Sequence, residues 1–174
     1  MEFVFETEYG QKEMIAMART LRKTIRKKHS RRSHIFGWIV MIIALLLILP
    51  IGDKVFTLDF KTIINCLVVG AIFLVLVFED RLNGCIAGKR MLKGLERAQA
   101  TFRDEGYYSE TEMGNTEWQY DKIGMLAETK DYFVFVFSPS HAQVYDKNNL
   151  TGGTIEEFRQ FIQDKTDKEI ISVQ

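Results

Sequence analysis

Residues 35–51 read IFGWIVMIIALLLILPI, and none of these side chains carries a charge. Twelve of them are Ile, Leu, Val or Phe, which gives about −4 to −7 kcal/mol for membrane insertion at roughly −0.3 to −0.6 kcal/mol each. A second apolar run, TIINCLVVGAIFLVLVF, occupies residues 62–78 and ends at Glu79 and Asp80. We therefore predict two transmembrane helices, residues 35–52 and 62–78, joined by an external loop at residues 53–61.

The averages of the whole chain conceal these two runs. The 174 residues include 23 Lys plus Arg and 23 Asp plus Glu, and the mean hydropathy of −0.07 is typical of a soluble protein. Only two cysteines are present, Cys66 and Cys85, so we expect no disulfide framework. The composition is that of a small membrane protein with a soluble part.

The distribution of Lys and Arg predicts the topology. Residues 1–34 contain nine basic and four acidic residues, whereas the external loop contains only Lys54 and Lys61. Basic residues resume after the second run. Because basic segments stay on the cytoplasmic side, we predict a multi-pass protein of the cell membrane with both termini cytoplasmic. Residues 101–174 hold seven basic and fourteen acidic residues, a formal charge of −7.

Residues 11–34 are predicted to form one basic amphipathic helix. Met14, Met17, Leu21 and Ile25 recur at three- and four-residue steps, and no Gly or Pro interrupts the segment before the first span. Basic side chains fill the rest of the circumference and are candidates for contact with anionic lipid headgroups; they are Arg22, Lys23, Arg26, Lys27, Arg31 and Arg32. The alternative is that they act only as a topology signal.

Two further features belong to the second span and its continuation. Asn65 is the one strongly polar side chain in the spans, and we expect it to make a polar contact with the first helix inside the membrane. Residues 79–100 are predicted to form a connecting amphipathic helix. Gly84, Gly88 and Lys89 lack one residue of the phosphate-loop spacing, so a Gly-x-x-x-Gly face for close helix contact is the better interpretation.

Residues 101–174 have the pattern of a small antiparallel sheet closed by a C-terminal helix. The run from Tyr132 to Phe137 is β-branched and aromatic, and Thr154 with Glu157 has the form of a capping box at a helix start. Residues 1–10 contain an alternating strand that is expected to join this sheet, because a lone strand is unstable. We expect four core anchors, with the first of them between the sheet and the closing helix: Trp118, Phe133, Phe135 and Phe158.

These residues resemble the YcxB-like family over most of the chain. The matching segments are Phe102–Gly106, Trp118 with Ile123, the Glu128–Phe133 stretch and the Glu156–Phe158 turn of the closing helix. The resemblance implies two membrane spans followed by a C-terminal domain of bacterial pleckstrin-homology-like shape. The predicted fold class is therefore membrane α+β, a transmembrane helical hairpin with a cytoplasmic small antiparallel sheet or pleckstrin-homology-like barrel. The resemblance carries no established reaction.

A search for chemistry favours binding over catalysis. The three histidines, His29, His34 and His141, lack the spacing of a zinc site, and no nucleophile and base pair is recognisable. We expect no enzyme activity, cofactor or metal, and no nucleic-acid or small-molecule partner. The leading hypothesis is a membrane-anchored interaction module, an accessory or regulatory subunit that contacts membrane lipids and a protein partner or a second copy. The alternative is a sensor of anionic lipids that uses the basic helix.

Overall fold

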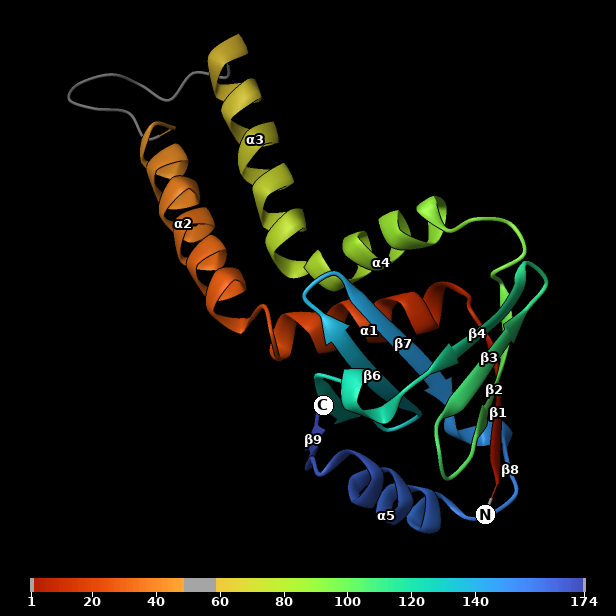
Figure 1. Ribbon diagram of the computed structural model, residues 1–174. Coiled ribbons are helices and arrows are strands. Elements are labelled where there is room, and N and C mark those ends of the chain that lie inside the picture. Colours follow the sequence, from red (N-terminus) through yellow and green to blue (C-terminus); the bar gives the residue numbers. More distant parts are fainter. Residues whose placement is uncertain (1, 49–58, 174) are drawn as a thin grey trace.

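The computed structural model describes residues 2–48 and 59–173 and has an α+β architecture (Figure 1). Two long helices, α2 (Lys27–Leu46) and α3 (Phe60–Val77), project together from one side of the molecule. Helices α1 (Gln11–Lys23) and α4 (Glu79–Arg90) lie at their base. The strands and helix α5 (Ile155–Thr166) form a compact body below, which we call the module.

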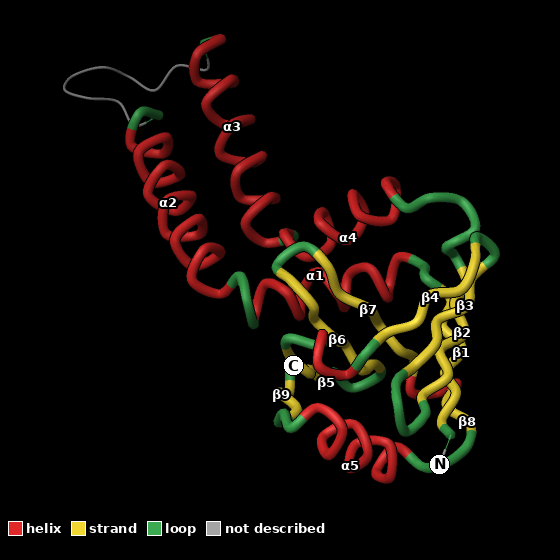
Figure 2. Tube along the Cα trace, viewed as in Figure 1, coloured by secondary structure: helices red, strands yellow, loops and turns green. Residues whose placement is uncertain are grey.

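The module contains two sheets (Figure 2). The five-stranded sheet has the order β4-β3-β2-β1-β8, with the bounds Gly114–Trp118, Tyr107–Thr111, Arg97–Phe102, Phe3–Glu8 and Leu150–Thr151. The four-stranded sheet has the order β7-β6-β5-β9, with the bounds His141–Asp146, Tyr132–Ser138, Met125–Glu128 and Ile170–Ser172. Two short 3-10 helices, Tyr120–Lys122 and Lys147–Asn149, connect strands.

Strand β6 is buried on both faces, which explains its uninterrupted apolar sequence. Because side chains alternate along a strand, Phe133 and Phe135 face the core between the two sheets, while Val134 and Val136 face the other way. On that second face they pack in one cluster with Leu21 of α1 and Val144 of β7. Helix α1 therefore covers the outer face of the four-stranded sheet, and residues 133–136 of β6 are buried on both faces.

Aromatic side chains fill the core between the sheets and α5. Phe158 of α5 lies with its ring centroid 4.6 Å from that of Phe5, 5.0 Å from Phe102 and 5.1 Å from Phe133. The helix begins with the predicted capping box, in which the Glu157 amide donates to the Thr154 hydroxyl and the Thr154 amide donates to the Glu157 carboxylate. The box fixes the start of α5 and so directs Phe158 into the core.

The N-terminal strand β1 lies inside the five-stranded sheet. It pairs antiparallel with β2 along its whole length and with β8 at Val4 and Phe5. Phe3 and Phe5 are completely buried. The start of the chain thus supplies part of the module's core, and the module is assembled from segments on both sides of the long helices.

Two details of the predicted sheet are corrected. The prediction of a single antiparallel sheet or barrel is wrong, because the described residues form two sheets with separate strand orders and no closed barrel. Strand β9 also pairs in parallel with β5, from Leu126 beside Ile170 to Glu128 beside Ser172. The physical reason is that Phe158 and Ile162 of α5 cover the core between the sheets, so strand closure is not required to exclude water.

The continuous helix predicted over residues 11–34 is divided at residues 24–26. The Thr24 hydroxyl bonds back to the Thr20 carbonyl at 2.6 Å, and the Arg26 amide reaches the Leu21 carbonyl at 2.9 Å. The break lets α1 lie along the sheet with Leu21 buried while α2 leaves it (Figure 1). The predicted helix over 79–100 is likewise shorter, since β2 already begins at Arg97.

One described helix, α3, is long and apolar enough to cross a membrane by length and composition. The predicted first span ends at residue 52, and residues 49–52 and most of the loop predicted at 53–61 lie outside the described residues. Most large apolar side chains of α2 and α3 point outward, among them Phe36, Phe60 and Leu67, which are all at least two-thirds exposed. The helical pair therefore presents an apolar surface, unlike the module.

Trp118 lies at the margin of the core rather than between the sheet and α5. It is only partly buried and packs against Phe137 at 4.8 Å and His141 at 5.6 Å between ring centroids. Its indole nitrogen is buried without a hydrogen-bond partner among the described residues. The anchor between the sheets and the closing helix is Phe158, which is completely buried.

We predict that Phe158→Ala destabilises the module more than Trp118→Ala. Removing the Phe158 ring leaves a cavity at the centre of the aromatic core and should cost about 3–5 kcal/mol. Trp118 sits at the rim, where neighbours and solvent can close the space, so its loss should cost less than about 3 kcal/mol. Denaturant unfolding of the purified full chain measures both. An equal or larger loss for Trp118→Ala would contradict this placement of the core.

Candidate functional site at the base of the helical pair

A bidentate ion pair joins α1 to the start of α4. Arg22 donates from Nε to Asp80 Oδ1 at 2.6 Å and from Nη2 to Asp80 Oδ2 at 2.7 Å. The hydrogen bond with Asp80 raises the pKa of the Arg22 guanidinium above its usual value, against a smaller opposing effect of burial. A fork of this kind fixes orientation as well as distance, so the end of α1 is held on the first turn of α4.

Glu79 extends the network to α2. Its Oε2 accepts a hydrogen bond from Ser30 Oγ at 3.2 Å and lies 2.6 Å from Nε2 of His34. The same carboxylate oxygen is 3.7 Å from Nε of Arg22. Three helices, α1, α2 and α4, therefore meet around two adjacent acidic residues that directly follow α3.

The close helix contact predicted for the Gly-x-x-x-Gly face forms at Gly84. A Cβ atom on Gly84 would lie only 2.8 Å from the backbone nitrogen of Ile15 and 2.9 Å from its Cα, and one on Gly88 would meet Met14 at 3.8 Å. Helices α1 and α4 thus approach closely at a position that tolerates no side chain. Gly84, which weakens α4 as an isolated helix, is the residue that allows this contact.

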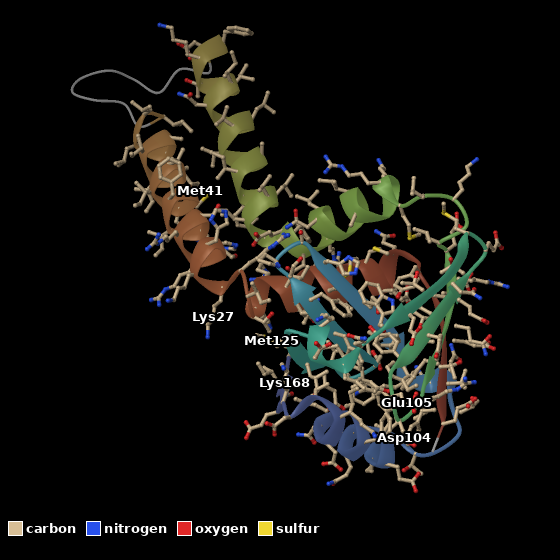
Figure 3. All side chains as sticks on the ribbon, viewed as in Figure 1. Lys27, Met41, Asp104, Glu105, Met125 and Lys168 are labelled. Atoms are coloured by element: carbon tan, nitrogen blue, oxygen red, sulfur yellow. The ribbon has the colours of Figure 1, made fainter. Side chains whose placement is uncertain are left out.

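An open groove of about 830 Å³ lies between the end of α1, the first turns of α2 and strand β9. Lys27, at the lower end of α2 in Figure 3, is on its wall. The described lining combines five basic side chains with two polar and two apolar residues and includes no carboxylate side chain; it consists of Arg22, Lys23, Lys27, Arg31, His34, Ser30, Ser172, Ile171 and Val173. The groove is therefore suited to an anion.

The structure separates the six basic residues that were predicted to contact lipid headgroups. Arg22 is held by Asp80, and Arg26 donates from Nε to the Pro139 carbonyl at 2.7 Å. Lys23, Lys27 and Arg31 line the groove together with Arg22, whereas Arg32 is exposed and lies outside the groove lining. These residues do not form one uniform basic surface, because two of them serve contacts between elements of the fold.

The other predicted site residues lie in different parts of the molecule. Phe133, Phe135 and Phe158 are buried in the core, and Trp118 packs against its edge. Asn65 is partly exposed on α3. The described residues supply no hydrogen-bond partner for its amide, so the expected polar contact stays a prediction.

Sequence reasoning missed the acidic partners of the basic helix and a second network within the module. Glu79 and Asp80 were recognised only as the end of a span, although adjacent acids after an apolar run are a usable signal for pairing with preceding cations. Glu128 accepts from Lys147 Nζ at 2.6 Å and from Arg159 at 2.7 and 3.0 Å. Burial raises the pKa of Glu128, but the hydrogen bonds from Arg159 and Lys147 outweigh it and bring the pKa below its usual value.

Residues 2–48 and 59–173 hold no group of three or more His, Cys, Asp or Glu side chains placed to bind a metal ion. The clusters described above are ion pairs and hydrogen-bonded contacts between elements. Their chemistry is electrostatic: they position helices and leave a basic groove beside them.

Comparison with known proteins gives one match. Residues 102–162 match the model of the YcxB-like protein family, a region that runs from the end of β2 into the last turns of α5. No curated protein and no solved structure matches the chain. The match covers most of the module and neither the helical pair nor the basic groove.

We predict that Gly84→Ala loosens the junction between α1 and α4. The added methyl group would meet the backbone of Ile15, and overpacking of this kind costs about 1–3 kcal/mol. Gly70→Ala on α3 is the matched control, because a Cβ there meets nothing within 4 Å. Thermal unfolding in mild detergent should show a lower midpoint for Gly84→Ala only. Equal midpoints for the two variants would mean that the close contact does not support the fold.

Proposed function

We propose that the chain is a membrane-anchored interaction module, an accessory or regulatory subunit of a membrane protein assembly. In this proposal α2 and α3 belong to two membrane spans, both termini lie in the cytoplasm, and the module docks a protein partner close to the membrane. The role is binding rather than catalysis.

The anchor is supported by the surface of the helical pair. Outward-facing side chains are mainly apolar on α2 from Ile35 onward and along α3, and such an exposed apolar surface needs a covering. Basic residues lie at the start of α2, and acidic residues lie at the start of α4, just after the end of α3. The start of α2 and the end of α3 therefore form one charged end of the helical pair. A bilayer around the apolar lengths with its cytoplasmic surface at this charged end satisfies both features.

A free sheet edge carries the docking part of the proposal. Strand β4, Gly114–Trp118, is an end strand of the five-stranded sheet, and β3 is its one partner among the described strands. Its residues from Gly114 to Glu117 are all exposed. An uncovered edge offers unpaired backbone N–H and C=O groups, to which an extended segment of another protein can add as a further strand.

Strand β7 is the end strand on one side of the four-stranded sheet, and side chains of the N-terminal segment bind its backbone. Strand β4 is therefore the better candidate for docking a further strand. The Tyr9 hydroxyl donates to the Val144 carbonyl at 3.2 Å, and the Asp146 amide donates to the Thr7 hydroxyl at 3.2 Å. Burial raises the pKa of Tyr9 to about 12. The remaining end strands, β8 and β9, have two and three residues.

The charge of the module favours a protein partner over direct attachment to anionic lipid. Residues 101–174 carry a formal charge of −7, and anionic headgroups repel a surface of the same sign. Glu110, Glu112 and Glu117 lie on or beside the exposed hairpin of β3 and β4. A partner segment with basic residues would match this edge and would associate faster at low salt.

Thiol labelling tests the two spans and their orientation. In a chain with Cys66 and Cys85 replaced by Ser, a cysteine at Phe60, which is 77% exposed at the start of α3, should react with an impermeant reagent added outside the cell. A cysteine at Ser140, in the exposed turn between β6 and β7, should react only after the membrane is opened. Labelling of Ser140→Cys in intact cells would overturn the proposed orientation.

Site-specific photocrosslinking tests the docking edge. A photoreactive residue in place of Asn115, which is exposed on β4, should give one light-dependent crosslinked protein in cells. The matched control is Gln160, which is exposed on α5 and should give no such band. Mass spectrometry of the crosslinked band identifies the partner. The absence of a band at Asn115, or the same bands at both positions, would contradict docking at β4.

A further inference from the structure

Two cations of the groove, Lys27 and Arg31, differ from Arg22 and His34 in having no carboxylate partner among the described residues. They stand four residues apart on α2, so they lie on one side of the helix, and both are exposed. Two other side chains of the groove are already engaged: Arg22 forms an ion pair with Asp80, and Nε2 of His34 lies 2.6 Å from Glu79 Oε2. Lys27 and Arg31 therefore remain to receive a ligand in the groove.

We propose that this groove binds the phosphate of an anionic phospholipid, whose acyl chains lie along the apolar face of α2. The inference rests on the proposed membrane placement and adds a defined ligand site to it. The phosphate is held by Lys27 and Arg31, and Ser172 of β9 presents a hydroxyl on the opposite wall.

The start of α2 favours an anion at this place. Its first turn contains no acidic residue, and Arg26 at the N-cap makes no side-chain capping bond. The positive end of the helix dipole is therefore not compensated by a side chain in that turn. Lys27 and Arg31 also repel each other at a spacing of four residues, and a bound phosphate relieves both effects.

Among the described residues, the acids closest to these cations in the fold, Glu79 and Asp80, do not neutralise Lys27 and Arg31. Glu79 faces Ser30, His34 and Arg22, and Asp80 faces Arg22 and also Arg19 at 3.6 Å. Both acids lie in the first turn of α4 and contact these side chains rather than Lys27 or Arg31. The groove wall that remains toward solvent carries Lys27 and Arg31.

The face of α2 above the groove indicates a lipid rather than a free phosphate. Steps of three and four residues from Lys27 and Arg31 lead to Ile35, Trp38, Ile42 and Leu45, which are between 44% and 53% exposed. At about 1.5 Å per residue, Trp38 lies roughly 10 Å and Leu45 roughly 21 Å along the helix from Arg31. The cationic groove would match the phosphate of a phospholipid, and the apolar face that continues from it would match the acyl chains.

The test measures lipid contact at Trp38 in the full chain reconstituted into phosphatidylcholine vesicles. Phosphatidylglycerol with brominated acyl chains is titrated in, and quenching of tryptophan fluorescence reports its occupancy beside α2. Trp118 lies in the module and contributes an unquenched background. The groove variant is Lys27→Ala with Arg31→Ala. The matched control is Lys28→Ala with Arg32→Ala, which removes the same charge from the same helix outside the groove lining.

Both variants lose the same general attraction to an anionic surface. The ratio of their affinities for phosphatidylglycerol therefore measures what the groove itself contributes to binding. We expect the groove variant to bind phosphatidylglycerol about tenfold more weakly than the control, the change that one charge-assisted hydrogen bond to phosphate represents. Equal affinities would overturn the site. Displacement of the bromolipid by millimolar glycerol 3-phosphate would overturn the lipid as its occupant.

Alkaline extraction of the same membranes separates this inference from the proposed function. If the chain stays in the membrane and the two variants bind phosphatidylglycerol equally, the groove site is wrong and the anchor stands. If alkaline buffer releases the chain, the anchor itself is wrong and the lipid site fails with it.

Discussion

The close contact between α1 and α4 is the constraint on which the arrangement of the two halves depends. Helix α4 follows α3 directly, and α1 packs on the four-stranded sheet through Leu21. The backbone of Ile15 can approach α4 only because Gly84 has no side chain. The Arg22–Asp80 ion pair then fixes the orientation of the two helices. The helical pair and the module are therefore joined by packing, and a change at one can be transmitted to the other.

The N-terminal segment gives the module its core and closes one of its edges. Phe3 and Phe5 enter the aromatic cluster, while Thr7 and Tyr9 bind the backbone of β7. A module cut from this chain at residue 101 would lose those groups together with β1 and most of β2. The core of the module accordingly includes residues that precede the first long helix, and it extends beyond the region that matches the YcxB-like family.

Features that depend on neighbours in the sequence were predictable, and features that depend on distant partners were not. The Thr154–Glu157 capping box, the apolar β6 and the Gly84–Gly88 face all follow from local spacing. The marginal position of Trp118 does not, because its exposure depends on where β4 ends relative to Phe137 and His141. The parallel pairing of β9 is equally invisible, since three residues after a helix carry no signal for their partner strand.

The ion pairs of the candidate site also depend on distant partners and could not be predicted from local sequence. Composition alone presents Arg22, Arg26, Lys27 and Arg31 as equivalent members of one basic run. Folding distinguishes them, because Arg22 binds Asp80 and Arg26 binds the Pro139 carbonyl. Lys27 and Arg31 have no such partner among the described residues. A carboxylate that pairs with a cation offsets the attraction of that cation for an anionic ligand. A cation beside a groove that has no such partner retains this attraction. The binding capacity of a basic helix is therefore set by the acids that the fold brings to it, here the two residues that directly follow α3.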